Sequence, residues 1–275
     1  MMAGPDGGRY FRKQDGWADR ADRIREDLRV HRVHTFHTEL PAERRDGVRS
    51  VTSVVRTAMG DSFEDLHPKV QWRFGLSAAD GLCQIGVGVM EEMTHSALVT
   101  RPVLALGARR GLFPGGRGTG VPFTVANYAY TDDLGRETMS FVRRFSFVGK
   151  PQGMNSVMVT PAVSQGHEVA LDYLGYSSDM LVHTRCSADA DGGILLESGA
   201  PRIRGMRVPA FASALTTGRE WWDEGEQRHR IQIDVTSPTL GRLFHYRGWF
   251  TAEERPCAPA DIPEDARPSR LEERE

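Results

Sequence analysis

The sequence of 275 residues has few cysteines, few lysines and no long uninterrupted apolar run. Its three cysteines, Cys83, Cys186 and Cys257, are odd in number and far apart, which excludes a disulfide framework or a zinc site of paired cysteines. The most apolar stretch, residues 97–113, is broken by arginines and a proline, so it cannot cross a bilayer. Because residues 1–13 lack the apolar core of a secretory signal, we expect a cytoplasmic protein.

Charges of one sign are not in excess, since 35 lysines and arginines face 37 aspartates and glutamates. No global field therefore attracts nucleic acids or anionic membranes. Local basic pairs such as Arg109-Arg110 have no interleaved aromatic residues that would stack on bases. We expect neither a nucleic-acid partner nor a membrane partner.

Motifs for cofactors and metals are also missing. The glycine-rich stretch 115–120 follows no strand and precedes no ribose-binding acid, so it is interpreted as a loop and not as a dinucleotide site. His31, His34 and His37 meet only loosely on one side of a helix and alternate on a strand, which is more typical of a solvated segment than of a metal site. No cofactor and no metal are expected, and the role of the three histidines stays open.

The chain divides by composition into three parts. Residues 1–57 are predicted to form an N-terminal extension, partly disordered, with a short amphipathic helix over 17–32. Residues 58–251 are predicted to form a single β-rich domain. Residues 252–275 carry several prolines and many charges, and they are predicted to be a disordered tail.

Inside the domain, apolar residues follow first a helical period and then a strand period. Helices are predicted over 62–76 and 97–110, with Pro102 kinking the second helix or marking its true start. Strands are predicted over 83–89, 121–131, 137–148, 155–163, 169–176, 180–186, 193–198, 228–236 and 242–250. Short Asp/Gly turns between them require antiparallel pairing. The predicted fold is α+β and mainly antiparallel β: a curved sheet or lipocalin-like β-barrel of about eight strands with two or three flanking helices.

Several short motifs follow one another along the domain: Met59–Phe63, Leu66–Val70, Phe141–Phe145, Asp191–Gly193 and Pro238–Gly241 leading into Tyr246–Gly248. In order and spacing they resemble the bacterial domain-of-unknown-function family 4166, which also occurs C-terminal to saccharopine-dehydrogenase-like reductases. The resemblance covers roughly 190 residues. Phe141 stands where the family pattern has tryptophan, and Asp172 stands where it has glutamate. The resemblance implies a fold, but no activity or cofactor that could be carried over.

One strand carries an arginine on an apolar face. This face of residues 137–148 consists of Met139, Phe141, Arg143, Phe145 and Phe147. A guanidinium cannot shed its charge, so its burial requires a carboxylate or a bound anion. The first interpretation is an ion pair with Asp172 or Glu197; the second is an arginine aimed into a cavity at a carboxylate or enolate oxygen of a ligand.

Other residues complete the candidate site. Asp172 alternates with apolar neighbours, and a carboxyl group in an apolar cavity has a raised pKa and exchanges protons near neutrality. Tyr246 could donate a hydrogen bond to a ligand and counts with Arg143 and Asp172 as a candidate catalytic residue. The candidate ligand-binding residues are Tyr128, Phe141, Phe145, Tyr173 and Glu197.

The leading hypothesis is that the barrel binds a small, largely apolar organic molecule. It would catalyse a cofactor-independent cyclisation, isomerisation or dehydration in specialised metabolism, in which Arg143 stabilises negative charge and Asp172 moves a proton. The alternative is a non-catalytic carrier of a hydrophobic metabolite, or an accessory subunit of a partner reductase. A third reading is an interaction protein with a filled barrel, against which a cavity of several hundred Å³ would argue. The sequence leaves substrate identity and a homodimer open.

Overall fold

A computed structural model describes residues 52–95, 101–147, 151–161 and 169–268. The chain divides into two compact units, Met1–Val48 and Arg49–Glu275, and the described residues all belong to the second. The amphipathic helix predicted over 17–32 and the three histidines His31, His34 and His37 lie outside the described residues.

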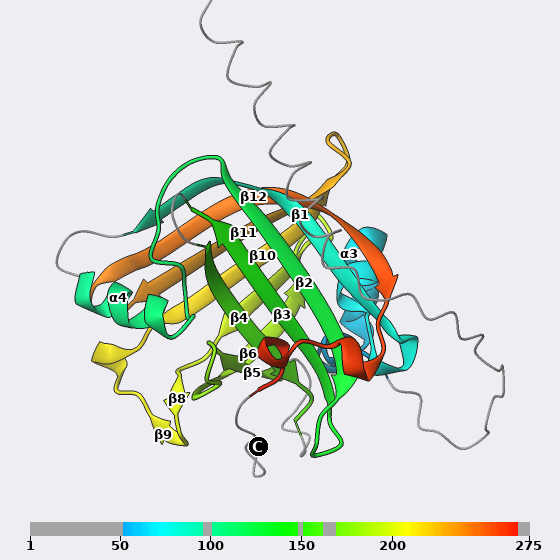
Figure 1. Cartoon of the computed structure of the whole chain (residues 1–275), viewed down its shortest axis with the longest axis horizontal. Coiled ribbons are helices and arrows are strands. Elements are labelled where there is room, and N and C mark those ends of the chain that lie inside the picture. The colour runs from blue at the N-terminus through cyan, green and yellow to red at the C-terminus, as the bar shows by residue number, and fades with distance from the viewer. Residues whose placement is uncertain (1–51, 96–100, 148–150, 162–168, 269–275) are drawn as a thin grey trace, which may run out of the picture. The chain divides into compact units, whose positions relative to one another are not determined.

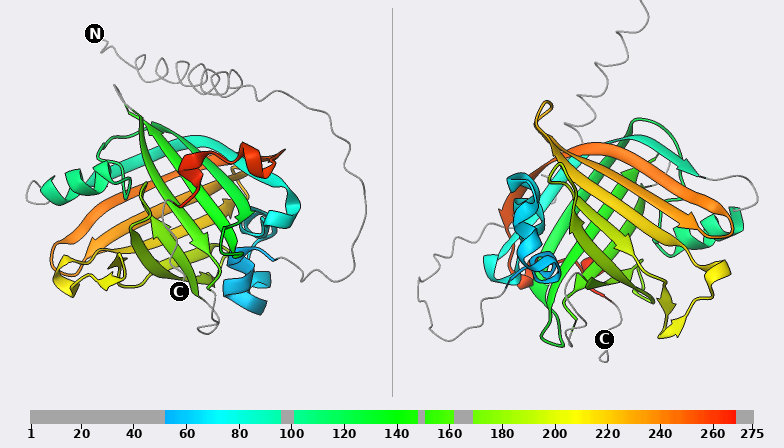
Figure 2. Two further views of the ribbon diagram at one scale, coloured as in Figure 1. Left: turned by 60° about the horizontal axis from the view of Figure 1, so that its bottom comes forward. Right: turned by 180° about the vertical axis from the view of Figure 1, so that it is seen from behind.

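Ten strands of the described residues close into an antiparallel β-barrel (Figures 1 and 2). In order around the barrel they are β5 (Val169–Leu174), β4 (Pro151–Val159), β3 (Glu137–Ser146), β2 (Val121–Thr131), β1 (Leu82–His95), β12 (Gly241–Pro256), β11 (Arg228–Ser237), β10 (Leu215–Asp223), β7 (Ile194–Ser198) and β6 (Met180–Ala188). Strand β6 then pairs with β5 and completes the ring. The predicted fold class is therefore confirmed, with more strands than the eight expected.

One missed strand, β10, accounts for part of that difference, and two short strands lie outside the ten of the barrel. Strands β8 (Arg202–Ile203) and β9 (Met206–Arg207) form a small hairpin beside β6. Strand β10 escaped the sequence analysis because its inward face lacks apolar alternation. Its inward positions in the register with β11 are Thr216, Gly218, Glu220 and Trp222.

Short helices close one end of the barrel, and α4 (Arg101–Arg109) lies near the other end (Figures 1 and 2). The first group is α2 (Val54–Met59), the 3-10 helix η2 (Gly60–Asp65), α3 (Pro68–Phe74) and the 3-10 turn η3 (Ala78–Asp80). The single helix predicted over 62–76 is thus split, because Pro68 cannot continue a helix and instead begins α3. No helix in the described ranges is both long and apolar enough to span a membrane.

Apolar residues fill most of the barrel interior. One cluster joins α2 and α3 to the barrel wall, with Phe63 and Phe74 packed near Phe141. A second cluster, which includes Phe145 and Phe250, is formed mainly by the inward side chains of β1, β2, β11 and β12. These two clusters bound the space that remains for a site.

Glycine allows β1 and β12 to approach closely. A Cβ at Gly248 would lie 2.2 Å from the Val89 carbonyl oxygen, and one at Gly88 would lie 1.9 Å from the Trp249 carbonyl oxygen. Both contacts are with backbone atoms of the paired strand, which cannot rotate away. This pairing also contains a bulge between Met90 and Glu92, so the strands bend strongly here.

The C-terminal segment corrects the prediction of a disordered tail from residue 252. Strand β12 continues to Pro256, and the chain then forms the 3-10 turns η6 (Pro259–Asp261) and η7 (Glu264–Ala266), of which η7 packs on β3 and β4 (Figure 1). Tyr130 donates a hydrogen bond to the Ala266 carbonyl oxygen at 3.0 Å. Composition could not reveal this order, because the segment is fixed by side chains more than a hundred residues upstream.

Candidate functional site

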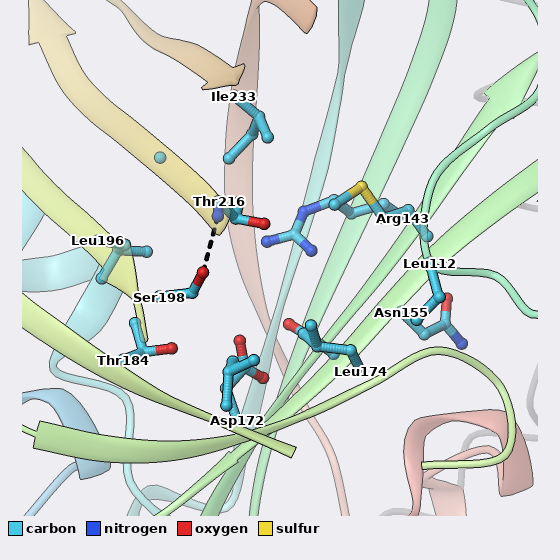
Figure 3. Close-up of a pocket in the computed structure, with 14 residues that line it drawn as sticks. Leu112, Arg143, Asn155, Asp172, Leu174, Thr184, Leu196, Ser198, Thr216 and Ile233 are labelled. Atoms are coloured by element: carbon cyan, nitrogen blue, oxygen red, sulfur yellow. Dashed lines mark hydrogen bonds between the residues drawn. The ribbon is translucent and has the colours of Figure 1, made fainter. Parts of the chain in front are cut away.

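A pocket lies in the barrel between the two apolar clusters (Figure 3). The centre of a water molecule can occupy about 60 Å³ of it, room for roughly four or five waters. Its polar lining residues are Arg143, Asn155, Ser156, Asp172, Thr184, Ser198 and Thr216. Its apolar lining residues include Leu112, Met154, Leu174, Val182, Leu196 and Ile233. The pocket is smaller than a drug-sized site of several hundred Å³, so it has room for only a few heavy atoms.

Arg143 reaches this pocket from the middle of β3. In the barrel register it lies opposite Val125 on β2 and Met154 on β4, with the side chain directed inward. Figure 3 shows its guanidinium pointing into the cavity. Its side chain is 9% exposed, and its Nε atom is buried without a hydrogen-bond partner. The guanidinium carbon lies 5.3 Å from the ring centre of Phe141, a cation–π contact.

The charge of Arg143 has no counter-charge in direct contact. Among the described residues, no carboxylate oxygen lies within 4.0 Å of its guanidinium. The predicted ion pair with Asp172 or Glu197 is therefore not formed. A buried guanidinium without a partner in direct contact is costly, because its charge is removed from water without full compensation.

Asp172 faces the same cavity from β5 (Figure 3). Its Oδ1 atom is buried without a hydrogen-bond partner. Burial raises the pKa of the carboxyl group to about 7, although the positive charge of Arg143 and a hydrogen bond with Ser156 both oppose the rise. Near neutral pH both protonation states are populated, which is the condition for proton exchange with a ligand.

Hydroxyl groups line the wall between these two residues. Thr184 on β6 and Ser198 on β7 are paired in register, and the Thr184 hydroxyl is buried without a partner. Ser198 accepts a hydrogen bond from the Thr216 backbone N–H at 2.7 Å, drawn as a dashed line in Figure 3. The sequence analysis missed these residues. Their alternation with Val182 and Leu196 was the available signal, because residues two apart on a strand share a face.

Comparison with known proteins now places the chain. Residues 66–250, which contain Arg143 and Asp172, match the model of a domain of unknown function, DUF4166. The chain belongs to the DUF4166 family. It is also similar to an uncharacterized protein, YndH, of Bacillus subtilis (strain 168), with 29% identity over 194 residues, 69% of this chain and 92% of the relative. The resemblance seen in the sequence is thereby confirmed.

Three predicted site residues lie in the interior of the DUF4166 barrel but behind the pocket wall. Tyr246 is fully buried, and its ring centre lies 5.5 Å from that of Phe145 in an edge contact. Burial raises the pKa of Tyr246 to about 12, so its hydroxyl stays protonated; that hydroxyl is buried without a partner. Phe141 contacts the guanidinium of Arg143 with the face of its ring. These residues shape the pocket from behind and are not among those that line it.

Three other predicted residues face away from the pocket. Tyr173 packs in a separate outer cluster, because its neighbour Asp172 points inward. Glu197 is exposed, since Leu196 and Ser198 on either side line the cavity. Tyr128 packs beside the C-terminal segment on the outer face of β2. The structure thus places each of these three residues one position away from a strand position that faces inward.

A second buried polar group lies at the α3 end of the barrel. Arg73 Nε is 3.3 Å from Glu220 Oε1, and Arg73 Nη1 donates a hydrogen bond to Gln84 Oε1 at 3.2 Å. His229 Nδ1 lies 3.4 Å from the same Glu220 oxygen. Burial alone would raise the pKa of Glu220, but the neighbouring Arg73 and His229 outweigh it and the pKa is lowered. The charge of Arg73 is thus compensated by a carboxylate in direct contact, whereas the charge of Arg143 is not.

A larger cleft lies at the α3 end of the barrel, between α3, the β10–β11 hairpin and β12. The centre of a water molecule can occupy about 410 Å³ of it, and its lining includes Lys69, Trp72, Trp222 and His229. Lys69 already lies 5.4 Å from the ring centre of Trp222. The cleft offers no charged group in the position of Arg143, so we place the candidate site in the barrel.

Proposed function

We propose that this DUF4166 protein binds a small organic molecule with a carboxylate or carbonyl oxygen in the barrel pocket. It would catalyse a cofactor-independent isomerisation or dehydration of that molecule. The observation that supports this best is the buried guanidinium of Arg143, which has no carboxylate within 4.0 Å and shares a pocket with Asp172. One side of the pocket offers a fixed positive charge, and the other offers a titratable proton.

The proposed chemistry is proton transfer beside a carbonyl group. The Asp172 carboxylate takes a proton from the carbon next to the carbonyl, and the electron pair of that C–H bond forms a carbon–carbon double bond. The carbonyl π electrons move onto its oxygen, whose negative charge Arg143 stabilises. Where the substrate carries a β,γ double bond, protonated Asp172 then gives the proton to the γ carbon; the dienolate electrons re-form the carbonyl and leave the double bond between the α and β carbons, which isomerises the substrate. Alternatively it protonates a β-hydroxyl group, which leaves as water while the enolate electrons form the new double bond.

Deuterium exchange tests this step without knowledge of the true substrate. A panel of short uncharged ketones and aldehydes, which leave Asp172 free to ionise, is incubated with the protein in D2O, and loss of the α-proton signal is followed by NMR. We expect faster exchange than in buffer for at least one compound, and loss of that acceleration in Asp172→Asn and Arg143→Met. Glu197→Gln, on the outer face of a neighbouring strand, is the matched control. Exchange at the buffer rate throughout, or equal rates in Asp172→Asn, would refute the catalytic proposal.

A non-catalytic carrier is the second candidate, and the apolar half of the pocket lining favours it. Leu112, Val182 and Ile233 could hold a hydrocarbon portion while Arg143 holds a polar end. Native mass spectrometry of the purified protein would identify a co-purifying molecule. A carrier would retain that molecule unchanged on incubation, whereas an enzyme would convert it, and the Asp172→Asn variant would then retain it unconverted.

A further inference from the structure

The charges of the ionisable groups inside the barrel do not sum to zero at every pH. Among the described residues near the pocket, Arg73 is paired with Glu220 at 3.3 Å, and this pair is neutral as a unit. Arg143 has no carboxylate within 4.0 Å. Asp172 is the one carboxyl group among the described residues that line the pocket, while Glu220, which shares a smaller neighbouring cavity with Arg143, is already paired with Arg73. The net charge of the pocket is therefore about zero when Asp172 is ionised and about +1 when Asp172 is protonated.

The other titratable groups around Asp172 stay uncharged near neutral pH. On β6, Cys186 is buried, and burial raises the pKa of its thiol to about 12. On β12, the pKa of Tyr246 is likewise raised to about 12 by burial. On β4, Ser156 contributes only a hydroxyl hydrogen bond. Arg143 on β3 is thus the one charged side chain that acts directly on Asp172.

We propose that the pocket binds a small monoanion of the short-chain carboxylate class together with one proton, which Asp172 takes up. This inference rests on the ligand site of the proposed function but not on catalysis. An anion on Arg143 would bring a second negative charge into a pocket that already contains the Asp172 carboxylate. One guanidinium in a low-dielectric site cannot compensate two such charges, so the weaker acid site accepts a proton.

Protonated Asp172 also fits the ligand better than the carboxylate does. Its Oδ1 atom has no hydrogen-bond partner, and a carboxylate can only accept hydrogen bonds. Once protonated, the group can donate an O–H to the oxygen of the bound anion. The ligand charge then replaces the Asp172 charge as the counter-charge of Arg143. The size of the pocket limits such a ligand to roughly the dimensions of formate, acetate or propionate.

Isothermal titration calorimetry with acetate between pH 6 and pH 9 tests the inference. The titrations use chloride-free buffers of different ionisation enthalpy, and formate and propionate extend the series. With Asp172 titrating at about pH 7, the association constant should fall about tenfold from pH 6 to pH 8 and nearly tenfold again to pH 9. At pH 8, the buffer dependence of the heat should report uptake of close to one proton per acetate bound.

Three variants separate the two residues from the rest of the barrel. Asp172→Asn should bind acetate with an affinity that does not change over this pH range and without proton uptake. Arg143→Met should lose saturable binding, while Arg143→Lys should keep a weakened form of it. Glu197→Gln should match the natural protein. Circular dichroism checks the fold of each variant, and if Arg143→Met does not fold, Arg143→Lys and Asp172→Asn decide.

Several outcomes would overturn the inference. These are absence of binding of all three anions at pH 6, an affinity that is constant from pH 6 to pH 9, or binding that persists in Arg143→Met. The proposed catalysis fails separately. Proton-linked binding without any deuterium exchange would remove the enzyme and leave an anion carrier. Exchange that depends on Asp172, combined with pH-independent binding, would remove the proton linkage and leave the enzyme.

Discussion

Replacing Asp172 by asparagine is expected to stabilise the protein, and to do so more strongly as the pH rises. Asparagine resembles the protonated carboxyl group in shape but cannot ionise. In the folded protein, burial raises the pKa of Asp172 from 3.8 to about 7. The folded state therefore binds this proton more tightly than the unfolded state, and the natural protein loses stability as the pH rises from about 4 to about 7.

The magnitude follows from the two pKa values. With 3.8 in the unfolded state and about 7 in the folded state, ionisation of Asp172 costs about 2 kcal/mol at pH 5 and at most about 4 kcal/mol at pH 8. The free energy of unfolding of Asp172→Asn, relative to that of the natural protein, should thus increase by about 2–3 kcal/mol between these pH values. Comparing this free-energy difference at two pH values removes any effect of the substitution that does not depend on pH, such as altered packing.

Urea unfolding followed by tryptophan fluorescence measures this quantity at pH 5, 6, 7 and 8. Glu137 needs a control, because burial also raises its pKa to about 7. Its Oε1 atom accepts a hydrogen bond from the Ala78 N–H at 2.6 Å. The comparison is therefore repeated in a Glu137→Gln background. If the difference in unfolding free energy between Asp172→Asn and the natural protein is the same at pH 5 and pH 8, the assignment of Asp172 as a buried, titrating acid is wrong.

Three further substitutions test the frame around the site. Arg73→Met should destabilise the protein by about 3–5 kcal/mol in urea unfolding, because it leaves Glu220 buried without its partner; a loss below about 1 kcal/mol would mean that the pair is not desolvated. Gly248→Ala should lower the free energy of unfolding by more than about 3 kcal/mol or prevent folding, since its Cβ would overlap a backbone oxygen of β1. Thermal unfolding equal to that of the natural protein would contradict this close approach of β1 and β12. Tyr130→Phe should cost about 1–2 kcal/mol by removing its hydrogen bond to Ala266. Hydrogen exchange should show faster exchange confined to residues 257–268, and unchanged protection there would contradict this docking of the C-terminal segment.

Much of the barrel could be predicted from the sequence because strand residues alternate between two environments. Strand β2 has the predicted bounds, 121–131, and β3 begins at the predicted Glu137. Its inward face carries Phe141, Arg143 and Phe145 as expected. The prediction failed where the interior is polar. Strand β10 faces inward with Thr216 and Glu220, a pattern that resembles a solvated loop when its burial is unknown.

The sequence by itself determined that Arg143 and Asp172 lie on inward faces, because the two-residue period is a local property of each strand. It could not determine which carboxylate meets which arginine. Glu220 meets Arg73, 147 positions away along the chain, and this pairing leaves Arg143 without a carboxylate within 4.0 Å. Only closure of the barrel decided this, since the registers of ten strands together set the distances across the interior. The tertiary structure thus turned a buried arginine, which local pattern interpreted first as half of an ion pair, into the centre of a candidate anion site.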